Sequence, residues 1–132
     1  MQQTTATAGH PLVGAWRVAP APPGPPLAVI VYHADGTLVY AAPPAGSPHP
    51  TPAHTPAYGV WEPTGEHTAA LTASLVETDA SGRVLGTLTF HGTVQLEETL
   101  DAYQYTGMAE AADPSGAVVS TRPSGTRATR GR

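Results

Sequence analysis

The placement of proline most constrains how this chain folds. The 132 residues include 15 prolines, and none of them lies between positions 64 and 113. Most of the prolines lie in segments 20–26 and 43–56. Because proline donates no hydrogen bond to a sheet and breaks helix interiors, these clusters mark loops. Within the proline-free stretch apolar and polar residues alternate with a period of two, which predicts long strands.

The same alternation, bounded by turn signals such as Asp35-Gly36 and Ser81-Gly82, predicts eight strands. They cover residues 12–19, 27–34, 37–42, 57–62, 67–78, 84–97, 101–112 and 117–122. No segment has a convincing helical period. Short turns between successive strands indicate an all-β, antiparallel up-and-down sheet. Since closure removes unpaired edges, we expect an eight-stranded β-barrel, with a flattened sandwich as the alternative.

Three segments divide the chain. Residues 1–9 are polar and are expected to be a flexible N-terminus, and residues 10–122 form the barrel. Residues 123–132 begin with a proline, are rich in arginine and are expected to be a flexible basic tail. The low-complexity segment 43–56 is expected to be an extended surface loop.

Composition excludes several classes of function. The chain has no cysteine and no lysine, which excludes disulfides, thiolate metal sites and lysine Schiff-base chemistry. Residues 1–121 carry ten acidic residues against two arginines, which disfavours nucleic-acid binding. The N-terminus lacks the pattern of a signal peptide, and no run approaches the length of a membrane helix. We therefore expect a soluble, cytoplasmic protein with no nucleic-acid or membrane partner.

Aromatic and aliphatic residues of the expected strands are the candidate ligand-binding residues. Strand 84–97 places Leu88, Phe90 and Val94 on one face, together with Gly86 and Gly92, and we expect this face to point inward. Rings supply apolar area and tyrosine hydroxyls orient a ligand. The candidates are Tyr32, Tyr40, Trp61, Leu71, Leu75, Leu88, Phe90, Tyr103, Tyr105 and Met108. An eight-stranded barrel is barely wide enough for a ligand, so a hollow and a filled interior both remain open.

Two strands bear on oligomeric state. Tyr103 and Tyr105 share one face of strand 101–112, and Met108 lies on the other. Inward tyrosines would line a pocket, whereas outward ones would form a patch typical of an interface. Strand 27–34 is apolar on both faces, as a strand buried on two sides would be, and therefore predicts a homodimer.

Six histidines raise the question of a metal site. Two of them, His49 and His54, share the proline-rich loop, and no pair has the i, i+2 spacing of many sheet metal sites. We expect no metal and no cofactor. No nucleophile elbow or phosphate-binding glycine loop is present. We therefore assign no catalytic residue, although Glu77, Glu110 or His91 would be an acid or base if it faced a dry interior.

Short words in a fixed order carry a family resemblance. Gly14-Ala15-Trp16 opens the first strand, Asp35-Gly36 marks a hairpin, and Gly59-Val60-Trp61 follows, with Asp79-Ala80-Ser81-Gly82, Asp113-Pro114-Ser115-Gly116 and Gly125-Thr126-Arg127 later. Over residues 10–128 the chain resembles small bacterial lipocalin-like (calycin) barrel proteins. The resemblance implies an interior that binds small hydrophobic molecules. It also implies a late arginine, Arg127 or Arg122, packed on Trp16 to close the barrel.

The leading functional hypothesis is the binding of a small hydrophobic or amphipathic molecule inside the barrel. One alternative is a cofactor-free cyclase or isomerase of a polyene or polyketide-like substrate, which would act by shaping the substrate. The other is a packed structural barrel without a ligand. An internal cavity would favour the first two, and a carboxylate or histidine pointing into it would favour catalysis.

Overall fold

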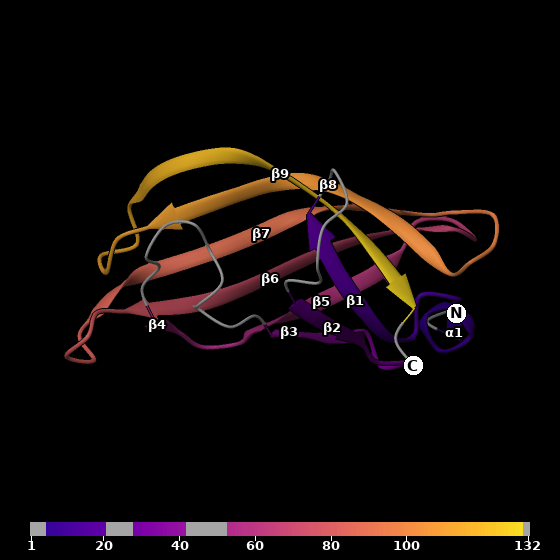
Figure 1. Cartoon of the computed structure of the whole chain (residues 1–132), viewed down its shortest axis with the longest axis horizontal. Coiled ribbons are helices and arrows are strands. Elements are labelled where there is room, and N and C mark those ends of the chain that lie inside the picture. The colour runs from indigo at the N-terminus through magenta and orange to yellow at the C-terminus, as the bar shows by residue number, and fades with distance from the viewer. Residues whose placement is uncertain (1–4, 21–27, 42–52, 131–132) are drawn as a thin grey trace.

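The computed structural model describes residues 5–20, 28–41 and 53–130 (Figure 1). Nine antiparallel strands form one sheet: β1 Gly14–Pro20, β2 Ala28–Tyr32, β3 Thr37–Ala41, β4 Ala53–His54, β5 Ala57–Pro63, β6 Thr68–Thr78, β7 Val84–Leu96, β8 Ala102–Ala112 and β9 Val118–Arg130. The sole helix of the described segments is α1 Thr5–Gly9. All eight predicted strands are present, and β4 is a short addition.

Eight of these strands close into an up-and-down barrel. Each pairs with the next in the order β1-β2-β3-β5-β6-β7-β8-β9, and β9 returns to pair with β1. Without the β6–β7 pairing the strands would form one open sheet, and this pairing joins its two ends. The predicted all-β barrel is therefore confirmed, and the flattened sandwich is not observed. Closure explains the alternation of buried and exposed residues along β6, where Ala69, Leu71, Ala73 and Leu75 face inward.

The strands differ in length, and the barrel is closed only along part of its axis. β5 pairs with β6 only as far as Ser74, and β1 pairs with β9 only from Thr126. Beyond these points β6, β7, β8 and β9 continue as a long curved sheet (Figure 1). The start of β1, the end of β9 and α1 lie at the opposite, closed end (Figure 1).

Acidic turns join the long strands, as their sequences indicate. In the turn after β6, Asp79 Oδ1 accepts hydrogen bonds from Ser81 N at 2.8 Å and Arg83 N at 3.0 Å. In the turn after β8, Asp113 Oδ1 accepts from Ser115 N at 2.9 Å and Ala117 N at 3.1 Å. These bonds replace backbone partners that the turn cannot supply and hold the pairing register.

Both predicted flexible ends are wrong in part. Residues 5–9 form α1 rather than a flexible segment, because His10 anchors the end of the helix at the barrel. The segment predicted as a basic tail continues β9 to Arg130 and pairs with both β8 and β1. Residues 1–4 and 131–132, and most of the predicted loop 43–56, lie outside the described residues, while Ala53–His54 within that loop pairs with β6.

One apolar face of β2 lies inside the barrel and the other lies on its outer surface. Ala28, Ile30 and Tyr32 are buried inside, whereas Val29 is 48% exposed on the outer face. Tyr58 and Val60 on β5 are similarly exposed, at 61% and 60%. Exposed apolar side chains on the outer face do not by themselves show an interface, so the homodimer stays a prediction. None of the helices in the described ranges is long and apolar enough to cross a membrane.

Candidate functional site

Four buried aromatic rings and one histidine close the end of the barrel where β1 begins. We call this set the aromatic floor. Its rings meet edge to face in series, with centroid separations of 5.6 Å (His10–Trp61), 5.7 Å (Trp61–Tyr32), 6.1 Å (Tyr32–Tyr103) and 4.9 Å (Tyr103–Trp16). This arrangement is the favourable geometry for aromatic pairs. The two Gly-x-Trp words thus place their tryptophans on opposite sides of a single buried cluster.

Arg130 covers the outer side of this floor. Its guanidinium carbon lies 3.9 Å from the centroid of the Trp16 ring. Its nitrogens donate to three backbone carbonyl oxygens, those of Leu100 at 2.8 Å, Pro11 at 2.9 Å and Val13 at 3.3 Å. One side chain therefore joins the last strand, the segment just before β1 and the β7–β8 turn.

The resemblance implied a late arginine on Trp16, but Arg127 and Arg122 are the wrong residues. Arg127 pairs instead with Glu97 on the outer face, with an Nε–Oε2 distance of 3.2 Å. Arg122 is exposed and lies opposite Ala109, beyond the closed part of the barrel. The barrel-closing role of Trp16 is consistent with its full burial.

His10 fixes the position of α1 against the floor. The side chain is 7% exposed, and its Nε2 donates to the Gly65 carbonyl oxygen at 2.9 Å. Its Nδ1 accepts from the Leu12 backbone N–H at 3.2 Å. These two bonds require the neutral tautomer with hydrogen on Nε2. This histidine is therefore a structural plug rather than a metal ligand.

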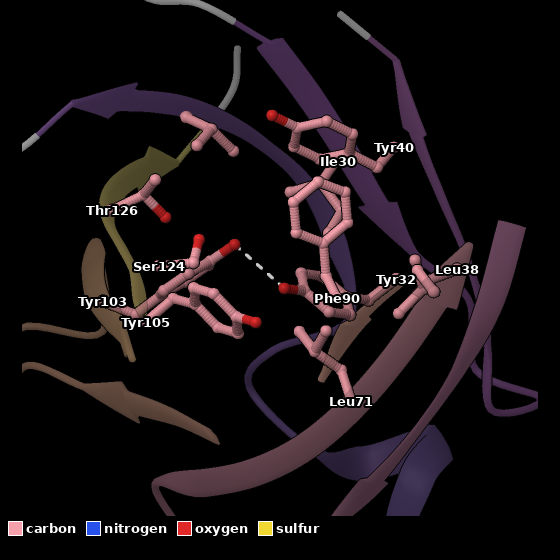
Figure 2. A pocket seen from close by; sticks show the side chains of 12 residues that line it. Ile30, Tyr32, Leu38, Tyr40, Leu71, Phe90, Tyr103, Tyr105, Ser124 and Thr126 are labelled. Carbon is pink, nitrogen blue, oxygen red and sulfur yellow. Dashed lines mark hydrogen bonds between the residues drawn. The ribbon is translucent and has the colours of Figure 1, made fainter. Parts of the chain in front are cut away.

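A cavity of about 60 Å³ lies inside the barrel above the floor (Figure 2). Its twelve lining residues come from seven strands: Val18, Ile30, Tyr32, Leu38, Tyr40, Leu71, Ala73, Phe90, Tyr103, Tyr105, Ser124 and Thr126. The lining is mostly apolar. Tyr40, Phe90, Ser124 and Thr126 are partly exposed, so the cavity opens to solvent on their side.

Three tyrosine hydroxyls converge on this cavity. The Tyr32 and Tyr103 hydroxyl oxygens form a buried hydrogen bond of 2.9 Å (Figure 2). The Tyr105 hydroxyl points into the same space and, among buried side-chain polar atoms of the described residues, is the one without a hydrogen-bond partner. Buried hydroxyls are nearly always paired, and leaving one unpaired costs about 1–3 kcal/mol. The Tyr105 hydroxyl is therefore the chemically distinctive atom of the cavity.

Burial disfavours ionisation of all three tyrosines. Loss of solvation raises the pKa of Tyr105 to about 12, with the nearby Tyr40 as a second cause. The same loss of solvation raises the pKa of Tyr32 and of Tyr103 well above its usual value. Near neutral pH each hydroxyl is consequently an O–H donor rather than a phenolate.

Two glycines position the Tyr105 ring. Gly92 on β7 pairs with Gly107 on β8, and the ring lies over both. A Cβ on Gly107 would lie 2.7 Å from the Tyr105 hydroxyl oxygen, and a Cβ on Gly92 would lie 2.9 Å from Cε1 of the ring. Absence of side chains at this pair thus leaves room for the tyrosine to lie along the sheet with its hydroxyl in the cavity.

The structure brings six of the ten predicted ligand-binding residues together in the cavity lining: Tyr32, Tyr40, Leu71, Phe90, Tyr103 and Tyr105. Trp61 is buried in the floor instead, where its Nε1 donates to the His33 carbonyl oxygen at 3.0 Å. Leu75 and Leu88 pack together in the core beyond the cavity. Met108 is paired with His91 on the outer face, so its inclusion was wrong.

Six lining residues were missed: Val18, Ile30, Leu38, Ala73, Ser124 and Thr126. The four apolar ones lie on inward positions of predicted strands, where alternation alone gives their direction. Ser124 and Thr126 belong to the segment predicted as a flexible tail. Their cavity position depends on the pairing of β9 with β1, for which the sequence carries no local signal.

Possible acid–base groups lie outside the cavity. Glu110 and His91 form an outer-face pair, with an Oε2–Nε2 distance of 3.6 Å. Glu77 shares the inward register of Leu75 but lies opposite Gly86, past the lining residues. Within the described ranges, no group of three or more His, Asp or Glu side chains is arranged to hold a metal ion. His49 is outside those ranges.

In comparisons with known proteins, no family model, curated protein or solved structure matches this chain.

Proposed function

We propose that this barrel binds a small, mostly apolar molecule in the cavity above the aromatic floor. The observation that carries the proposal is the Tyr105 hydroxyl, which is buried, unpaired and directed into an apolar space. A ligand oxygen would supply the missing hydrogen bond, and the surrounding rings would supply apolar contact. The pairing of one polar group with an apolar wall is typical of small-molecule sites.

The size of the cavity limits the ligand. A water molecule needs about 10–15 Å³ of comparable space, so a cavity of about 60 Å³ holds a few waters or one compact polar group. Pockets for drug-sized ligands span about 300–1,000 Å³. We therefore expect the polar end of the ligand to reach Tyr105 while its apolar body lies toward Tyr40 and Phe90. These two rings are partly exposed, and their centroids lie 6.0 Å apart at the mouth.

Binding is favoured over catalysis by the chemistry of the lining. No histidine, aspartate or glutamate is among the twelve lining residues. A tyrosine hydroxyl would polarise a carbonyl oxygen, but a cyclase or isomerase that moves protons also needs a base. A packed barrel without ligand is the competing function, and the modest cavity volume is the observation in its favour.

We further propose that the chain is a lipocalin-like protein. Support comes from the order of its eight barrel strands and from Arg130, which packs on the tryptophan of the first Gly-x-Trp word. A barrel of this kind agrees with an internal ligand site but does not identify the ligand.

The direct test is native mass spectrometry of the full chain purified from its own host, followed by a thermal-shift screen of small neutral aromatic and alicyclic compounds. We expect a co-purifying mass or compounds that raise the melting temperature. Ser124→Leu, which fills the mouth of the cavity, should abolish the shift. Ser120→Leu on the same face of β9, outside the lining, is the matched control and should retain it.

Either of two results would contradict the proposal. One is the absence of any co-purifying mass together with no shift across the screen. The other is an equal shift in the Ser124→Leu and Ser120→Leu variants, which would place binding elsewhere.

A further inference from the structure

Resting on the binding function proposed above, we infer that the ligand is electrically neutral and presents a hydrogen-bond-accepting oxygen, as in a ketone or aldehyde, to the Tyr105 hydroxyl. The inference concerns the chemical class of the ligand. It follows from the count of donors in the cavity, from the absence of charge in its lining and from the confined position of Tyr105.

The tyrosine hydroxyls of the cavity carry hydrogens that their one hydrogen bond does not use. Tyr32 and Tyr103 share one hydrogen bond, so one of the two donates and the other keeps an unused hydrogen. Tyr105 keeps its own hydrogen unused as well. Tyrosines are protonated near neutral pH, so two tyrosine O–H groups are available inside one apolar space, in addition to the Ser124 and Thr126 hydroxyls of the lining. A carbonyl oxygen has two lone pairs and matches this surplus of donors.

The lining carries no charged side chain that would balance an anion. Arg130 lies on the far side of Trp16 and is engaged by three carbonyl oxygens, and Arg127 pairs with Glu97. A carboxylate at Tyr105 would therefore be buried without a cation, and this is unfavourable. Close to the mouth, the described residues offer an anion the exposed Arg122, two positions beyond Ser124 on β9.

Arg122 defines the competing arrangement. An amphipathic acid would place its carboxylate at Arg122, outside the mouth, and its apolar tail in the cavity. That orientation would leave the Tyr105 hydroxyl unpaired against a hydrocarbon, so it does not explain why a hydroxyl lies there. A neutral carbonyl compound satisfies both the tyrosine and the apolar wall.

The position of the Tyr105 hydroxyl oxygen is confined by its surroundings. The Tyr105 ring is confined over Gly92 and Gly107, and the side chain is only 8% exposed. Phe90 and Tyr40 stand across the cavity from it (Figure 2). A bound ligand would thus meet the Tyr105 donor at one position. The site could therefore discriminate between a ligand with a C=O group and one with a C=CH2 group of equal size.

The test uses three probes on the full chain: acetophenone, its hydrocarbon isostere α-methylstyrene, and benzoate. Dissociation constants are measured by ligand-observed NMR for the native protein and for Tyr105→Phe, with Tyr58→Phe on the exposed outer face as the matched control. Acetophenone labelled with carbon-13 at its carbonyl reports the hydrogen bond directly, because that resonance moves downfield when the oxygen accepts one.

We expect acetophenone to bind about tenfold more tightly than α-methylstyrene, which corresponds to one buried hydrogen bond. Tyr105→Phe should remove this preference and the downfield shift while retaining α-methylstyrene binding, and Tyr58→Phe should change neither. Benzoate should bind more weakly than acetophenone.

Different failures overturn different statements. Equal affinity for acetophenone and α-methylstyrene would overturn the inference and leave the proposed binding function standing. Benzoate binding at least as tight as acetophenone binding, and weakened by Arg122→Gln, would also overturn it in favour of an amphipathic acid. Failure of all three probes to bind would count against both the inference and the proposed function.

Discussion

Arg130 lies across the face of Trp16, with its guanidinium carbon 3.9 Å from the ring centroid, and so joins residues 114 positions apart in the chain. The contact combines a cation–π interaction with hydrogen bonds to carbonyls of the segment just before β1 and of the β7–β8 turn. It closes the barrel at the end opposite the extended sheet. The cavity therefore has a closed floor and opens on the side of Tyr40 and Phe90.

Substitution of Arg130 tests this closure. Arg130→Met should lower the free energy of unfolding by about 2–4 kcal/mol, because it removes the cation–π contact and leaves backbone carbonyls without their donor. Arg127→Met is the matched control and should cost less than about 1 kcal/mol, since its ion pair with Glu97 is exposed to solvent. Urea unfolding followed by tryptophan fluorescence measures both. Equal losses would show that Arg130 has no special role.

The plug residue His10 gives a second prediction. His10→Ala should destabilise the fold by about 2 kcal/mol, because the buried Leu12 N–H loses its acceptor and Trp61 loses an aromatic neighbour. His33→Ala, at an exposed position, should change stability by less than about 0.5 kcal/mol. Thermal unfolding by circular dichroism compares the two variants. A His10→Ala variant as stable as the native chain would contradict the role of His10 as a plug.

Much of the fold could be predicted because the alternation of apolar and polar residues along a barrel strand shows which side chains point inward. Period-two alternation located all eight strands, and the acidic turns located their connections. The end of β9 could not be predicted in this way. Pro123 and the following arginines are typical of a tail. Among the described strands β1 pairs with β9 only from Thr126, so at Pro123 β9 pairs on one side only, with β8, and the proline is tolerated.

The site was only partly predictable, for a related reason. Alternation gives the face of a residue but not its depth along the barrel axis. Trp61 and Leu75 do face inward, yet one lies in the floor and the other beyond the cavity. The choice of Arg130 over Arg127 likewise depends on the pairing of Trp16 with Arg130 across β1 and β9. Such a register is set by tertiary closure, and no local sequence pattern contains it.

The glycine pair beneath Tyr105 gives a third prediction. Gly107→Ala should destabilise the protein by about 2–4 kcal/mol, because the new Cβ would overlap the His91 carbonyl oxygen and press on the Tyr105 hydroxyl. Gly125→Ala, one strand away, makes only an ordinary contact at 3.6 Å and should be tolerated within about 1 kcal/mol. Urea denaturation distinguishes the two. Equal stability would mean that the close approach at Gly107 relaxes freely.

Acid should weaken the turns after β6 and β8. Hydrogen bonds from Ser81 and Ser115 lower the pKa of Asp79 and of Asp113 below the usual value of 3.8. A lowered folded-state pKa contributes stability that is present above the unfolded value and is lost as pH falls through the folded one. The melting temperature should therefore fall below about pH 4.

Paired variants separate this effect from general acid denaturation. The double variant Asp79→Asn and Asp113→Asn should melt lower at pH 7 and depend less on pH between 5 and 3. Asp101→Asn, at an exposed position in the β7–β8 turn, should keep the native pH dependence. An unchanged pH profile in the double variant would show that these turns do not contribute.

Alkaline pH should act through the tyrosines of the cavity. The pKa of Tyr105 is raised to about 12 from a usual value of 10, so the folded state holds a proton that the unfolded chain releases. Stability from this group is complete below about pH 10 and is lost as pH rises toward 12. Tyr105→Phe should reduce this alkaline loss. At pH 8 without ligand, the same variant should be more stable than the native chain by about 1 kcal/mol, because an unpaired hydroxyl is removed.

Tyr103→Phe is the counterpart that fixes the interpretation. It removes a hydroxyl that is paired and leaves that of Tyr32 without a partner, so stability at pH 8 should fall by about 1–2 kcal/mol. Urea midpoints of the native protein and of both variants, measured at pH 8 and pH 11, provide the comparison. If Tyr105→Phe were as destabilising as Tyr103→Phe in the ligand-free protein, the Tyr105 hydroxyl would already have a partner, and the reason to place a ligand oxygen beside it would be lost.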